Sequence, residues 1–153
     1  MRNLPCSGDR FPRLFILALG LLKCEAAQAN AYLGLLYLSL SDLIVQAAEE
    51  VVDGKLDEHF PLDIFQTGSG TSTNTNANEV IANRCCQLAG KPMGARETVH
   101  PKDHVHMGPS SNDGIPSAVH MTPSGQIEKS PPPAHTQLAE ALHKHGMAVL
   151  ATV

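Results

Sequence analysis

Two polar segments of the chain carry residue types that could bind an anion. The first, at residues 66–71, reads Gln-Thr-Gly-Ser-Gly-Thr. Its glycines let backbone N–H groups approach a ligand closely, Ser69 and Thr71 add hydroxyl donors, and the helix expected after them contributes the positive end of its dipole. Because no P-loop lysine follows at the required spacing, these neutral donors suit a carboxylate better than a triphosphate. A plain Ser/Thr/Gly linker is the alternative interpretation.

The second polar segment combines histidines with short donors. Residues 100–106 read His-Pro-Lys-Asp-His-Val-His, and residues 110–113 read Ser-Ser-Asn-Asp. Three histidines and an aspartate could indicate a metal site, but the spacing His-x3-His-x-His matches no common zinc pattern. We therefore expect no metal here. The donors at 110–113 precede another expected helix, for which an ordinary N-cap is the alternative interpretation.

The order of residues along both segments resembles class II fumarase, of the fumarase/aspartase superfamily. The first matching stretch, residues 63–84, reads Asp-Ile-Phe-Gln-Thr-Gly-Ser-Gly-Thr-Ser-Thr-Asn-Thr-Asn-Ala-Asn-Glu-Val-Ile-Ala-Asn-Arg, and the second spans residues 100–113. Similarity extends over residues 11–121 and faintly to the end. Aspartase usually has Ala where this chain has Ser69 and Thr where it has Ser111. Both differences favour fumarase, and an aspartase-like ammonia-lyase is the alternative.

The resemblance implies reversible hydration of fumarate to L-malate, without a metal or organic cofactor. The family's reaction is an anti elimination through an aci-carboxylate, and donors on that carboxylate stabilise the developing charge. The positions that match the family's substrate-binding residues are Ser69, Gly70, Thr71, Ser110, Ser111 and Asn112. Those that match a second, peripheral dicarboxylate site are His100, Pro101, Lys102 and Asp103.

The resemblance also implies an incomplete chain. The family's Thr-His acid–base motif would begin just beyond Val153, and the serine loop with the proposed base lies much further on, so we expect no catalytic residue here. Three subunits of a tetramer build each family active site, which implies a homo-oligomer and a chain that is inactive alone. A non-catalytic remnant that at most associates with intact subunits is the competing hypothesis.

Several positions depart from the family pattern. Lys102 and His106 replace Asn, Pro109 replaces Gln, and Thr75 replaces Met. Pro109 removes a backbone N–H directly before the second set of donors. We interpret these departures as drift.

The elements that must position these residues are helices, and we predict an all-α fold with long polar loops. The expected helices cover residues 11–30, 40–53 and 75–88, a stretch from Pro116, and residues 137–145. Ser39 or Ser41 is expected to cap the second helix and Asn74 the third, and Gly54 to end the second. Prolines at 123 and 131–133 are expected to interrupt the last helices, at about 3 kcal/mol each.

We expect three parts: a loose leader at 1–10, a fumarase-like N-terminal lyase domain at 11–113, and the truncated start of the central helical domain at 114–153. An isolated chain of this kind should be poorly stable, because helices meant for a tetramer core would expose apolar faces.

Composition narrows the class of protein. The net charge of −4 offers no basic face for nucleic acid or a membrane surface. Four cysteines without a C-x-x-C pair indicate reduced thiols, and we expect a cytoplasmic protein, or a mitochondrial one in a eukaryote.

Arginines precede the apolar run 14–22, which resembles a signal peptide, but helical spacing of its apolar residues favours a helix packed in the interior.

Overall fold

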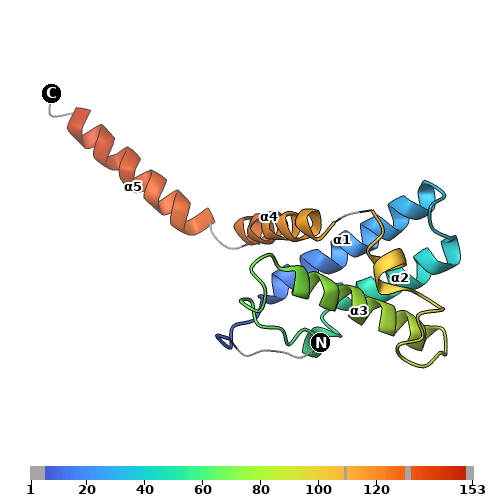
Figure 1. The fold of residues 1–153 in the computed structure, drawn as a ribbon. Helices are drawn as coiled ribbons and strands as arrows, with labels where there is room; N and C mark the ends of the chain where they lie inside the picture. Colours follow the sequence, from blue (N-terminus) through green and yellow to red (C-terminus); the bar gives the residue numbers. More distant parts are fainter. Residues whose placement is uncertain (1–5, 109, 130–131, 151–153) are drawn as a thin grey trace.

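The computed structural model describes residues 6–108, 110–129 and 132–150. The described residues form helices, without a strand, which confirms the all-α prediction. The elements are α1 (Arg13–Tyr32), α2 (Leu38–Val52), the short 3-10 helix η1 (Asp57–His59), α3 (Thr71–Leu88), the π-turn η2 (Pro101–Val105), α4 (Ser111–Lys129) and α5 (Pro132–Leu150). Figure 1 shows α1, α2 and α3 packed together, with α4 over α1 and α5 extending away from them.

Helix α1 is the centre of the core. It packs along α2, where Gly20 permits close approach: a Cβ there would lie 3.0 Å from Val52 Cγ2 and 3.3 Å from the carbonyl oxygen of Ala48. By length and apolar composition α1 could also cross a membrane, but half of its most apolar stretch is buried inside this fold. The packing therefore favours the interpretation of an interior helix.

The turn between α1 and α2 follows the prediction in part. Gly34 adopts φ +73° just after α1, and α2 begins at Leu38, two residues before the predicted start. The predicted serine cap is wrong, because the N-cap is Tyr37 without a side-chain hydrogen bond. Ser41 lies inside the helix instead, where its hydroxyl donates to the Ala27 carbonyl at 3.1 Å and joins α2 to α1.

Helix α3 begins at Thr71, four residues before the predicted start, so Asn74 is not its cap. The residue before the helix is Gly70, at φ +69°. The first turn, Thr-Ser-Thr-Asn, has no apolar side chain, so helical periodicity cannot reveal it. Asn74 is buried inside the helix, only 2% exposed.

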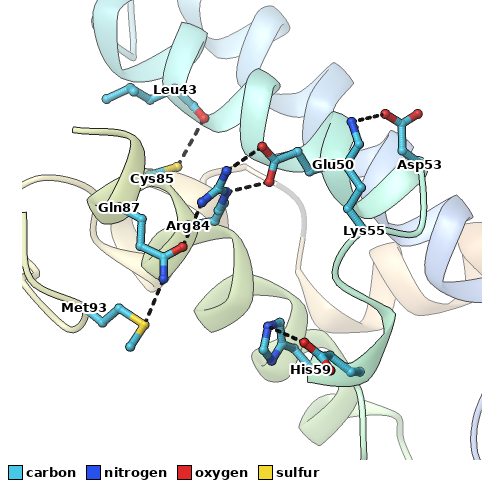
Figure 2. A network of polar contacts seen from close by, with 10 residues as sticks. Leu43, Glu50, Asp53, Lys55, His59, Arg84, Cys85, Gln87 and Met93 are labelled. Atoms are coloured by element: carbon cyan, nitrogen blue, oxygen red, sulfur yellow. Dashed lines mark hydrogen bonds and ion pairs between the residues drawn. The ribbon is translucent and has the colours of Figure 1, made fainter. Parts of the chain in front are cut away.

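A bidentate ion pair joins α3 to α2, as Figure 2 shows. Arg84 Nε lies 2.5 Å from Glu50 Oε2 and Arg84 Nη2 lies 2.8 Å from Glu50 Oε1. Next to it, the Cys85 thiol donates to the Leu43 carbonyl at 3.3 Å. Burial raises the pKa of Cys85 to about 12, so this thiol is a packing group.

The described part of the expected leader, residues 6–10, contacts the segment before the first polar loop. Backbone N–H groups of Cys6, Ser7 and Gly8 donate to Asp63 Oδ2 at 3.0, 2.7 and 2.8 Å. These bonds, that of Ser7 first, lower the pKa of Asp63 to about 2. The carboxylate therefore anchors this segment to the domain.

Helix α4 begins five residues before the predicted start and continues through Pro116 and Pro123. Near Pro123, which cannot donate a backbone N–H, hydroxyls of Thr122 and Ser124 donate to the carbonyls of Ala118 and His120 at 2.7 and 3.0 Å. The helix therefore does not end at Pro123 as we expected, and two side-chain hydroxyls bind backbone carbonyls next to this proline.

Helix α5 runs further in both directions than the predicted 137–145, and its apolar side chains Leu138, Leu142 and Met147 are 58%, 64% and 55% exposed. It begins at Pro132, and prolines fit the first helical turn, whose N–H groups have no partner inside the helix. Pro131 lies outside the described residues.

Candidate functional site

The first polar loop ends at the N-terminus of α3, against α4. A Cβ at Gly70 would lie 3.0 Å from Ile115 Cγ2, so glycine is required here by space as well as by its positive φ. The hydroxyls of Ser69 and Thr71 lie 2.8 Å apart, and both residues are exposed. The structure thus presents two adjacent hydroxyls at the positive end of a helix.

The second set of donors forms the start of α4. The Ser110 carbonyl accepts from the backbone N–H groups of Asp113 and Gly114, at 3.1 and 2.9 Å, which is the first turn of the helix. Ser110 and Asn112 are exposed, and Ser111 is half-buried. Pro109, the departure we expected to disturb these donors, lies outside the described residues.

Two contacts bring the segments together. Gly70 touches Ile115 in the first turns of α4, and a Cβ at Gly114 would lie 3.9 Å from Asn74 Oδ1 in the first turn of α3. Both helix N-termini therefore meet at one place (Figure 1). Backbone N–H groups at helix N-termini are unpaired inside the helix and favour anions, so this junction suits a carboxylate.

Under this junction lies a polar cluster that the sequence did not reveal. Lys23 Nζ lies 3.3 Å from His106 Nδ1, and Asn74 Nδ2 lies 3.4 Å from the same atom. Lys23 is 3% exposed, and its burial lowers its pKa to about 8. Burial, and then the charges of Lys23 and Lys102, lower the pKa of His106. The spacing of residues in α1 could have indicated that Lys23 is buried, because it lies on the apolar face of this helix between Leu19 and Ala27.

The residues that match the family's second site form η2 and its preceding residue. His100 Nδ1 accepts from the Asp103 backbone N–H at 3.1 Å, and His104 Nδ1 accepts from the His100 N–H at 2.9 Å. Pro101 is buried, and Lys102 and Asp103 are exposed. The histidines thus hold the turn, and the Asp103 carboxylate lies 3.1 Å from His100 Nδ1.

A metal centre is not assembled in the part of the chain that the structure describes, where no three His, Cys, Asp or Glu side chains gather as ligands. His100 and His104 bind backbone N–H groups through Nδ1, and His106 Nδ1 faces Lys23 and Asn74.

Comparison with known proteins places these features in a family. A family model described as lyase matches residues 8–149. Fumarate hydratase class II 2 of Bradyrhizobium diazoefficiens is 49% identical over 143 residues, covering 94% of this chain and 30% of that protein. Fumarate hydratase class II of Halobacterium salinarum is 51% identical over 142 residues, covering 93% of this chain and 30% of that protein.

Solved structures agree in fold. Class II fumarase from Schistosoma mansoni superposes with a TM-score of 0.73 at 44% identity, covering 79% of this chain and 25% of that chain. Fumarate lyase:delta crystallin from Brucella melitensis, in its native form, gives 0.75 at 41% identity, covering 78% and 28%. The chain spans about a third of the length of the curated relatives it matches. It belongs to the lyase family that includes the class II fumarate hydratases.

Proposed function

We propose that this chain supplies the N-terminal wall of a fumarate hydratase site, which holds a four-carbon diacid by neutral donors. The observation that carries the proposal is the meeting of two helix N-termini through Gly70 with Ile115 and Asn74 with Gly114. The relatives named fumarate hydratase class II, at 49% and 51% identity, support this choice of substrate.

Each donor has a defined task in this proposal. The hydroxyls of Ser69 and Thr71 and the donors of Ser111 and Asn112 bind one carboxylate, and Gly70 and Ser110 shape the backbone around them. Negative charge grows on that carboxylate as the adjacent carbon loses its proton, so donors fixed in advance lower the barrier. The acid and base are supplied by parts of the fold outside this chain.

The turn at His100–Asp103, in which Lys102 and Asp103 are exposed, is the proposed peripheral diacid site. Lys102 contributes a positive charge there, and the neighbouring Asp103 contributes a negative one. Oligomer formation is part of the same proposal, because the apolar side chains Leu138 and Leu142, one helical turn apart on α5, are 58% and 64% exposed. The free cysteines of the described chain fit a cytoplasmic or mitochondrial location.

A chimaera tests the proposed function. Residues 8–149 would replace the matching part of the Bradyrhizobium diazoefficiens relative, and fumarate hydration would be followed by the loss of its ultraviolet absorbance. We expect turnover in the chimaera, and a fall of about 100-fold in kcat for Thr71→Val, because one fixed donor is lost. Ser39→Ala, on the exposed start of α2, should leave kcat unchanged.

The alternatives give different results in the same assay. An inactive but folded tetrameric chimaera would indicate a non-catalytic remnant, and ammonia-dependent consumption of fumarate would indicate an ammonia-lyase. Turnover by the 153-residue chain alone would show that the missing acid and base are not needed, which contradicts the proposal.

A further inference from the structure

Lys23 is a buried cation that lacks a carboxylate partner among the residues described here. It is 3% exposed, and the ion pairs of the described chain involve other residues. Its contact is with His106 Nδ1 at 3.3 Å, a neutral acceptor when the imidazole is unprotonated. A buried charge is normally paired, because removing it from water is costly. Lys23 therefore combines a buried charge with a contact to a neutral group.

The surroundings of Lys23 connect it with the candidate site. His106 bridges it to Asn74, and the Asn74 backbone N–H donates to the Gly70 carbonyl at 3.0 Å. Asn74 also carries a buried side-chain oxygen, Oδ1, that has no partner and lies beside Gly114. Lys23 is thus linked through His106 and Asn74 to the start of α3, next to the hydroxyls of Ser69 and Thr71.

Lys23 is also one of the residues that line a hollow of about 290 Å³ between α1 and α4, together with Gly114 and Ser117 at the start of α4. A small anion that enters along the start of α4 would therefore approach a charge that is otherwise buried.

We infer that Lys23 supplies the positive charge of the diacid site, and that His106 holds its ammonium group against Asn74. The inference rests on the proposed function and adds to it, since the donors at residues 69–71 and 110–112 are all neutral. In a site of low dielectric constant, a single cation attracts a dicarboxylate more strongly than several neutral donors.

The two carboxylates near Lys23 in this hollow do not neutralise its charge. Glu25 and Asp113 line the same hollow, but both are exposed and neither forms an ion pair with Lys23. On the side of η2, the exposed Asp103 lies 3.1 Å from His100 Nδ1, and His106 and Lys102 add no negative charge. Binding of an anion should therefore stabilise the protonated form of Lys23 and raise its pKa.

The test uses the whole 153-residue chain, with lysine labelled by carbon-13 at Cε. The Lys23 signal is identified by its loss in Lys23→Met, and its pKa is measured by NMR without ligand, with fumarate, and with fumaramide, a neutral molecule of similar shape. We expect fumarate to raise the Lys23 pKa and fumaramide to leave it unchanged. A rise of one pH unit means that fumarate binds about tenfold more weakly at high pH than at neutral pH.

Variants give a second measurement. Lys23→Met should weaken fumarate binding about tenfold, whereas Lys91→Met, an exposed lysine on the loop after α3, should not change it. His106→Asn keeps an acceptor for Lys23 and should preserve most of the binding.

The outcomes separate the two proposals. If fumarate shifts the backbone signals of Thr71 and Ser111 but leaves the Lys23 pKa unchanged, this inference is overturned while the proposed function stands. If fumarate shifts none of these signals at any pH, this inference is overturned, whereas the proposed function is tested separately by turnover of the chimaera. The pKa values are measured on the unmodified chain. If Lys23→Met does not fold, the Lys23 Cε signal is identified instead by through-bond correlation with the Lys23 backbone amide.

Discussion

Replacing Lys23 with methionine should make the folded chain more stable at neutral pH. Burial lowers the pKa of Lys23 from 10.5 to about 8. At about 1.36 kcal/mol for each pH unit, the charged side chain therefore destabilises the folded state by about 3 kcal/mol. Loss of the contact with His106 offsets about 1 kcal/mol of this. The expected net gain for Lys23→Met, whose apolar side chain has a similar length, is about 2 kcal/mol.

The gain should depend on pH in a defined direction. Between about pH 8 and 10.5 the unfolded chain keeps the Lys23 proton while the folded chain has lost it. The unfolded state then binds more protons, so the stability of the unmodified protein rises with pH in this interval. Below it both states are charged and the full penalty applies, and above it the penalty is gone. The advantage of Lys23→Met is therefore present at pH 7 and disappears near pH 10.5.

Urea unfolding of both proteins, followed by circular dichroism at about pH 7 and about pH 10, measures this difference. The exposed residue Lys91 provides the control, because Lys91→Met should change stability by less than about 0.5 kcal/mol at either pH. A Lys23→Met protein that is less stable at pH 7, or a difference that is the same at both pH values, would refute the assignment of Lys23 as an unpaired buried charge.

Three further predictions concern the contacts that hold the helices and loops around the site in place. Gly70→Ala should cost at least about 1 kcal/mol more than Gly90→Ala in urea unfolding, because both glycines have a similar positive φ but only at Gly70 would a Cβ meet another side chain; equal losses would mean that the contact with α4 is absent. Asp63→Asn should destabilise the chain above about pH 4, and the difference should vanish as pH falls through about 2, where the native carboxylate is protonated; a difference that persists in acid would contradict this. A double-mutant cycle with Glu50→Gln and Arg84→Met should give a coupling of about 1 kcal/mol, and a coupling of zero would show that the bidentate pair does not form.

The helices of the first half were predictable because their apolar residues follow helical spacing. The prediction of 40–53 missed the start of α2 by two residues, and Gly54 lies just after its end, as expected. The starts of α3 and α4 were missed by four and five residues. The first turn of α3 buries the polar residues Thr73 and Asn74, and the first turn of α4 is polar and largely exposed. Periodicity of apolar residues detects neither kind of polar turn.

For the candidate site, the order of the residues singled out the hydroxyl and amide groups at 69–71 and 110–112, and the structure brings the helices that begin there together. Their binding of a carboxylate stays a prediction. Lys23 was missed because a lysine inside an apolar helix is usually expected to extend its charged end to solvent. Its contact with His106 spans 83 positions of the chain, and no local pattern predicts such a contact.

An anion bound to Lys23 would give the burial of this side chain, which costs stability, a use where it lies. The same desolvation that lowers the pKa of Lys23 also removes the water that would weaken its attraction for a bound anion. With a pKa of about 8, Lys23 is mostly protonated at neutral pH, so the charge is present when a diacid arrives. A surface lysine would be charged more fully but screened by solvent and salt. Stability lost in the free chain would therefore be recovered as binding energy, which is why the same substitution should strengthen the fold and weaken the site.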